Sequence, residues 1–139
     1  ALTHHYLPGM ILRGQGHVLN VASVGSFLAG PTCAAYYATK AYVLRLSEAL
    51  AEETRHTGVK VTAVCPGVFQ SGHWSDAAAR SPRRRKGRRV PTAAAMARAV
   101  MRAMDQGKVV SVPGPANKVG AFSTRLLPRG VLRRIAMYI

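Results

Sequence analysis

The sequence predicts an α/β fold in which a doubly wound parallel sheet is covered by helices on both faces, giving three layers (α/β/α). Segments with helical periodicity alternate with short β-branched segments along the chain, and this alternation is typical of parallel sheets. The β-branched segments are apolar along their length, as expected where both faces of a sheet are buried. The chain has 139 residues, 48% of them hydrophobic, which suits one domain with a real core.

The pattern places about three strands among the helices. In chain order we expect the end of a helix over 1–14, a buried strand over 16–23, a helix over about 34–56, a second buried strand over 59–67, a helix over 91–107, a third strand over 108–114, and one or two short amphipathic helices over 117–139. Gly58 and Gly107 close the two long helices, Pro91 lies near the first turn of the second one, and Pro128 breaks the tail.

The charge is strongly basic, with 20 Lys and Arg against 5 Asp and Glu and a net charge of +15. Residues 80–89, RSPRRRKGRR, concentrate this charge without any acidic residue. Such a field attracts phosphates, nucleic acid or an anionic membrane. The run has no interleaved aromatic residues and no recognition motif, so we expect no specific nucleic-acid binding. We interpret it as part of a flexible basic loop over about 72–90.

The cysteines and histidines point away from metal and disulfide chemistry. Cys33 and Cys65 have no CxxC spacing, and the 5 histidines form no HExxH or HxxxH pair, so neither a disulfide framework nor a metal site is expected. No run approaches the roughly 20 apolar residues of a membrane span, and residues 1–13 lack the apolar core of a signal peptide. We therefore expect a cytoplasmic protein.

Three side chains form the candidate catalytic group. Tyr36 and Lys40 are four residues apart and so share one face of a helix. An ammonium beside a phenol favours the phenolate and lowers the pKa of a tyrosine from its usual value near 10, as a general acid or base near neutral pH requires. Ser23, at the end of the preceding strand, could donate a hydrogen bond to a developing oxyanion. A YxxxK spacing alone also fits a tyrosine that simply packs on a lysine stem.

The position of these residues relative to the predicted strands also suits a ligand-binding site. In sheets of this kind, ligands bind beyond the carboxyl ends of the strands. Ser23 ends the first predicted strand, and Pro66 and Gly67 end the second one. The stretch LNVASVGSFLAGPTCAAYYATKAYVLRLSEALAEE resembles the short-chain dehydrogenase/reductase family, in its bacterial cytoplasmic branch. The resemblance spans residues 1 to about 115.

Three motifs carry the resemblance: a strand-terminal NVAS with Ser23 thirteen residues before Tyr36, the YxxxK motif within YYATK, and CPG followed by VFQS after the next strand. The resemblance implies a Rossmann-type fold, of which residues 1–115 would be the carboxyl-terminal half. Residues 116–139 would then form an amphipathic helical tail. Ser26 and Tyr37 have the same side chains as two of the catalytic candidates but lie off the family spacing, so neither is assigned a catalytic role.

The resemblance also implies an activity, the NAD(P)(H)-dependent interconversion of a carbonyl and a secondary alcohol. Tyr36 would exchange the proton, Lys40 would assist it and bind the nicotinamide ribose, and Ser23 would orient the substrate oxygen. The implied cofactor-binding residues are Tyr36, Lys40, Pro66, Gly67, Val68 and Ser71. The family usually forms dimers or tetramers, so a homodimer or homotetramer is expected for the full-length protein.

The sequence departs from the family pattern in one respect. It contains no TGxxxGxG turn that opens a helix, the feature that binds the cofactor pyrophosphate, and no NNAG segment. The choice between NAD and NADP therefore stays open. We expect the 139 residues alone to be poorly folded and inactive, with an exposed edge on the first strand. The alternative is a noncatalytic fragment or degenerate relative that serves interaction or oligomerisation.

The tail admits three interpretations. A basic amphipathic helix can lie on an anionic membrane, which would give the protein a peripheral membrane contact. It can equally cap an apolar substrate pocket, or form a subunit contact. The apolar character of the tail hints at a hydrophobic ketone, alcohol or lipid-like substrate.

Overall fold

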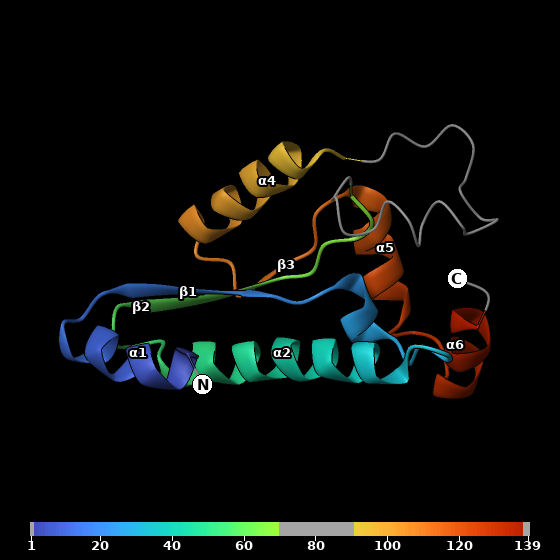
Figure 1. The fold of residues 1–139 in the computed structure, drawn as a ribbon, viewed down its shortest axis with the longest axis horizontal. Coiled ribbons are helices and arrows are strands. Elements are labelled where there is room, and N and C mark those ends of the chain that lie inside the picture. Colours follow the sequence, from blue (N-terminus) through green and yellow to red (C-terminus); the bar gives the residue numbers. More distant parts are fainter. Residues whose placement is uncertain (1, 70–90, 138–139) are drawn as a thin grey trace.

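The computed structural model describes residues 2–69 and 91–137. Helices and strands alternate in it as predicted (Figure 1). In chain order the elements are α1 (Leu2–Leu12), β1 (Gly16–Val21), the 3₁₀ helix η1 (Val24–Phe27), α2 (Ala34–Glu53), β2 (Val59–Val64), α4 (Ala93–Asp105), β3 (Val110–Ser111), α5 (Pro115–Ser123) and α6 (Arg129–Ala136).

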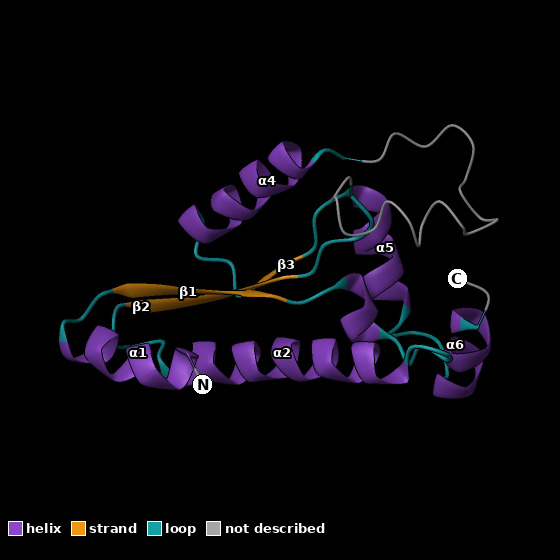
Figure 2. Cartoon of the chain, viewed as in Figure 1, coloured by secondary structure: helices purple, strands orange, loops and turns teal. Residues whose placement is uncertain are grey.

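The three strands form one parallel sheet in the order β1-β2-β3. Figure 2 shows α1 and α2 on one side of this sheet and α4 on the other, so the predicted three-layer α/β fold is confirmed. The register pairs Gly16 with Val59 and Val21 with Val64. Among the described residues β1 pairs on one side only, and Val21 at its end is 56% exposed.

The core lies between α2 and the sheet. Leu44 of α2 and Ala63 of β2 are fully buried there. Ser47 of α2 is buried as well, and its hydroxyl is satisfied twice. It accepts a hydrogen bond of 2.9 Å from the Asn20 amide of β1 and donates one of 2.7 Å to the Val43 carbonyl. Because a buried hydroxyl is costly when unpaired, this arrangement fixes α2 against β1.

Several elements, among them α2 and β3, are shorter than their patterns predicted. We expected the second helix to reach about residue 56, but α2 ends at Glu53. The hydroxyl of Thr54 donates to the Leu50 carbonyl at 2.7 Å, and the chain then turns toward β2. The third strand, expected over 108–114, contains only Val110–Ser111. Pro113 has no N–H for a strand ladder, which limits how far this strand can extend.

The remaining helices agree with the sequence in number and differ slightly at their ends. Thr92 caps α4, with its hydroxyl accepting a hydrogen bond of 3.2 Å from the Ala95 N–H, so Pro91 directly precedes the cap, near the first turn as expected. The tail forms two helices separated at Pro128, as predicted, and α5 begins at Pro115. None of the helices in the described part of the chain is long and apolar enough to cross a membrane.

The sheet directs its carboxyl ends toward one end of the molecule. β1 leads into η1 there, and both α5 and α6 lie at the same end (Figure 1). This is the end at which parallel sheets bind their ligands.

Candidate active site

Ser23 lies at the carboxyl end of β1 and caps η1. Its hydroxyl oxygen accepts a hydrogen bond of 3.1 Å from the Gly25 N–H, and its own N–H donates to the Ser26 hydroxyl at 3.3 Å. The residue is 8% exposed. Because the Ser23 hydroxyl acts as an acceptor in this cap, its proton is still available for donation to another oxygen.

Ser26 uses its hydroxyl differently. Its oxygen accepts from Ser23, and its proton is donated to the backbone carbonyl of Lys40 at 2.8 Å. Ser26 thus joins η1 to α2 and is itself buried. Its one proton is committed to this bond, which makes it a residue that holds the site together.

Tyr36 and Lys40 lie close together in the first part of α2. The Lys40 ammonium nitrogen is 6.0 Å from the centroid of the Tyr36 ring. The same nitrogen donates a hydrogen bond of 3.0 Å to the Val21 carbonyl at the end of β1. The structure therefore brings the lysine of the predicted group to the tyrosine and to the strand that leads into Ser23. Tyr36 is 38% exposed, so solvent and small molecules can reach it.

Tyr37 has a different environment from its neighbour. A methyl group placed on Gly30 would lie only 2.1 Å from the Tyr37 ring, so this ring packs directly on the backbone. Burial raises the pKa of Tyr37 above its usual value, which disfavours its phenolate. Its ring meets that of Tyr36 edge to face, with the centroids 5.7 Å apart. Tyr37 is therefore placed to support Tyr36 sterically.

The predicted wall of the nicotinamide pocket begins where β2 ends. The carbonyl of Pro66 accepts a hydrogen bond of 3.0 Å from the Val24 N–H. The segments that follow β1 and β2 therefore stay paired beyond the ends of the strands. Pro66 is buried, whereas Val68 is 71% exposed. Ser71 lies outside the described residues, as do the basic run at 80–89 and the last two residues of the tail.

Gly67 is in close contact with a residue that the sequence interpretation missed. A methyl group on Gly67 would lie 2.5 Å from the side-chain amide of Asn117 in α5. That amide donates a hydrogen bond of 2.7 Å to the Pro113 carbonyl. The sequence offered one clue to Asn117. It follows the third strand and so had to lie at the same end of the parallel sheet as Ser23.

Cys65 is fully buried, and burial raises the pKa of its thiol to about 11 although a hydrogen bond from the Ser23 backbone opposes this. It is therefore a neutral packing group. Within residues 2–69 and 91–137, no three His, Cys, Asp or Glu side chains gather in a way that could hold a metal ion.

The part of the chain that carries Ser23, Tyr36 and Lys40 is similar in sequence to known proteins. Residues 1–81 match the sequence profile of a family described as short chain dehydrogenase. Over 65 residues the chain is 40% identical to 2-(R)-hydroxypropyl-CoM dehydrogenase of Xanthobacter autotrophicus, an alignment that covers 47% of this chain and 26% of that protein. Over 66 residues it is 42% identical to 2-keto-3-deoxy-L-fuconate dehydrogenase of Xanthomonas campestris, covering 47% and 22%.

The fold is similar to solved structures over nearly the whole chain. A short-chain dehydrogenase from Sphingobium yanoikuyae, solved in complex with NADPH, is 26% identical with a TM-score of 0.68, and the match covers 89% of this chain and 47% of that one. The chain thus spans about half the length of such structures, and its alignments cover about a quarter of the curated relatives.

Proposed function

The chain belongs to the short-chain dehydrogenase family, and on that premise we propose that it supplies the catalytic residues of a nicotinamide-dependent oxidoreductase acting on a carbonyl or a secondary alcohol. One observation carries the proposal. The Lys40 ammonium lies 6.0 Å from the centroid of the Tyr36 ring and 3.0 Å from the last carbonyl of β1, so it connects the tyrosine to the end of the sheet where ligands bind.

Tyr36 is the residue that handles the proton. In the direction of reduction its hydroxyl donates a proton to the substrate oxygen, and in oxidation the phenolate removes it. The positive charge of Lys40 would attract the negative charge that develops on the phenolate. Its bond to Val21 holds the ammonium in place, so the charge does not have to be reoriented when the proton moves.

Ser23 orients the substrate oxygen. Its hydroxyl oxygen is fixed by the Gly25 N–H, so its free proton points from a defined position. Donation to the same substrate oxygen would polarise the carbonyl and stabilise the alkoxide-like transition state. In this proposal Ser26 and Tyr37 act as supports for Ser23 and Tyr36.

A nicotinamide cofactor, NAD or NADP, fits the donor set at this end of the sheet. Lys40 could bind its ribose, and the backbone at Pro66, Gly67 and Val68 could wall its nicotinamide, with Ser71 contributing from the following segment. When bound, the cofactor supplies or accepts the hydride at the carbon while Tyr36 moves the proton. We further propose that groups outside these 139 residues bind the adenine and the pyrophosphate, because the chain has no glycine-rich turn that opens a helix.

Deuteride transfer tests the reaction type. The full-length protein is incubated with a ketone panel and with NADH or NADPH that carries deuterium at the transferring position. We expect one deuterium on the carbinol carbon of the product, detected by mass spectrometry and located by NMR. Absence of turnover with every ketone and secondary alcohol, with both cofactors, would contradict the proposal and favour the noncatalytic alternative. A product without the label would mean that the hydride does not come from the cofactor.

A further inference from the structure

A cavity of about 200 Å³ lies between η1, α5 and α6. Val24 and Leu28 line it from η1 and its end, and Leu132 and Ile135 line it from α6. Gly120 of α5 forms another part of the wall. These residues come from three segments that are separate in sequence, and four of the five have branched apolar side chains. The cavity therefore presents mainly hydrocarbon to a ligand.

The hydroxyl protons of Ser123 and Thr124 in the wall, and one N–H of Asn117, already have acceptors. The hydroxyl of Ser123 donates to the Gly120 carbonyl at 2.8 Å, and the hydroxyl of Thr124 donates to the Ala121 carbonyl at 2.7 Å. The amide of Asn117 donates to the Pro113 carbonyl at 2.7 Å. Each of these bonds stays within the residue's own segment. A charged or strongly polar ligand would find few groups to replace its hydration, and this is unfavourable.

The cavity adjoins Ser23, one of the proposed catalytic residues. Val24, in its wall, directly follows Ser23 in the chain and donates its N–H to the Pro66 carbonyl at 3.0 Å. Asn117, also in the wall, touches Gly67. Part of the cavity wall is thus next to the serine and to the turn that would wall the nicotinamide. A group held in the cavity could be attached to a carbon that reacts beside Ser23 and Tyr36.

We propose that this cavity takes the apolar body of the substrate, a hydrophobic ring or a branched hydrocarbon chain joined to the reacting carbonyl or alcohol carbon. The inference rests on the proposed oxidoreductase function and names the class of substrate. An apolar cavity of about 150 Å³ can hold benzene, so a cavity of about 200 Å³ suits a single six-membered ring with a small substituent. In this view α5 and α6 form the specificity wall of the site.

Gly120 offers a way to fill the cavity without disturbing the rest of the structure. A methyl group built on it meets nothing within 4 Å, so a larger side chain there would extend into open space. Gly120 lies inside α5, where almost any other residue is more favourable for the helix than glycine. Because Gly120 also lines the cavity, leucine at this position should narrow it and leave α5 intact.

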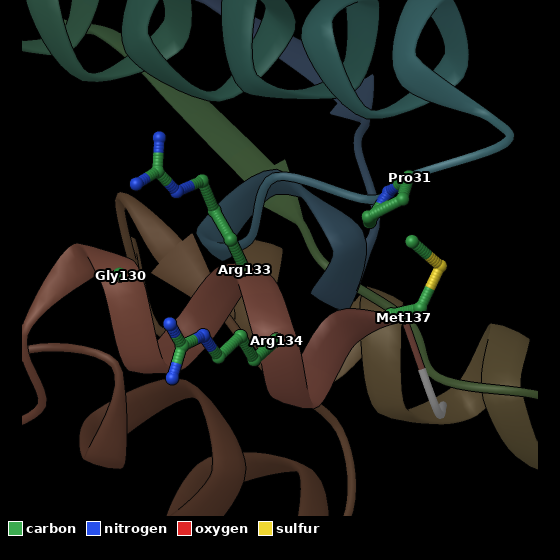
Figure 3. Close-up of a pocket in the computed structure, with 5 residues that line it drawn as sticks. All are labelled: Pro31, Gly130, Arg133, Arg134 and Met137. Atoms are coloured by element: carbon green, nitrogen blue, oxygen red, sulfur yellow. The ribbon is translucent and has the colours of Figure 1, made fainter.

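Gly130 provides a matched control. It lies in α6 and borders a different hollow, together with Pro31, Arg133, Arg134 and Met137. Figure 3 shows the side chains of Arg133 and Arg134 extending from α6, with Met137 near Pro31. A methyl group on Gly130 would meet only the end of the Arg133 side chain, at 4.0 Å. Leucine at this position also replaces a helix glycine but leaves the apolar cavity open.

The test compares Gly120→Leu and Gly130→Leu in the full-length protein. Binding of fluorobenzene, an apolar ring without hydrogen-bond donors, is followed by ¹⁹F NMR. Turnover is measured with acetophenone, which has a ring, and with acetone, which has none. We expect Gly120→Leu to weaken fluorobenzene binding and to lower kcat/KM for acetophenone by about tenfold or more. Acetone turnover should change little, and Gly130→Leu should resemble the wild type. Circular dichroism and thermal unfolding check that both variants fold.

Two outcomes would overturn the inference: a folded Gly120→Leu variant that still binds fluorobenzene like the wild type, or one that loses acetone and acetophenone turnover equally. Failure of the proposed function gives a different result. In that case fluorobenzene would still bind and be displaced by Gly120→Leu, but no ketone would be reduced by any variant. The cavity would then remain an apolar binding site, and only its link to substrate turnover would fall.

Discussion

Replacing Tyr36 with phenylalanine is expected to lower turnover by about 10²- to 10⁴-fold, the usual contribution of a positioned general acid or base. The substitution removes one oxygen and keeps the ring, which is 38% exposed and meets Tyr37 edge to face. The packing and the fold should therefore be unchanged. The loss should appear in kcat as well as in kcat/KM, because proton transfer occurs in the transition state.

The neighbouring residue supplies the control for this prediction. Tyr37→Phe also removes a single phenolic oxygen, from the next position of the same helix. Because Tyr37 packs on Gly30 and burial raises its pKa, we assign it no proton transfer and expect most of the turnover to remain. If the two variants lost activity equally, or if only Tyr37→Phe did, the assignment of the proton to Tyr36 would be wrong.

Replacing Gly58 with alanine should destabilise the fold by about 3 kcal/mol or more. Gly58 has a φ of +73°, in the left-handed region, and a methyl group on it would lie 2.0 Å from the carbonyl oxygen of Gly14. The backbone conformation alone costs about 1–2 kcal/mol for an L-residue, and the contact with a rigid backbone atom adds to this. The next residue, Val59, pairs with Gly16 of β1, so the clash lies where the register of the sheet begins.

Gly14→Ala separates the cost of the left-handed backbone conformation from the cost of the steric contact. Gly14 has a similar φ of +68°, but a methyl group there meets nothing within 4 Å. This variant should lose only about 1–2 kcal/mol, the cost of the left-handed conformation. Urea unfolding of both variants of the full-length protein gives the comparison. Equal losses would show that the approach of the Gly14 carbonyl to Gly58 is not as tight as described.

The sequence was a good guide to the elements and a poorer guide to their ends. Strongly periodic segments such as α2 and the apolar run of β2 appeared where expected. The 3₁₀ helix after β1 was not predicted, because its four residues are too few to show a period and its signal is the cap formed by Ser23 and Ser26. The end of α2 depends on a side-chain bond from Thr54 to its own helix, which no hydrophobic pattern reveals.

The proximity of Tyr36 and Lys40 was predictable from their spacing, but the contacts that hold the candidate site together were not. The four-residue spacing of Tyr36 and Lys40 was enough to place them together on one helix. The bond of the Lys40 ammonium to the Val21 carbonyl and the contact of Gly67 with Asn117 depend on the tertiary packing of segments that are distant in sequence. The same holds for the cavity, since its walls come from η1 and from the tail.

The most direct test of the catalytic group is a crystal structure of the full-length protein with a nicotinamide cofactor and an unreactive carbonyl analogue. We predict that the Tyr36 hydroxyl and the Ser23 hydroxyl both lie within hydrogen-bond distance of one ligand oxygen, at about 2.6–3.2 Å, with the Lys40 ammonium between the tyrosine and the ribose. An analogue bound elsewhere, or a Tyr36 hydroxyl turned to solvent while Ser23 contacts no ligand atom, would contradict the account.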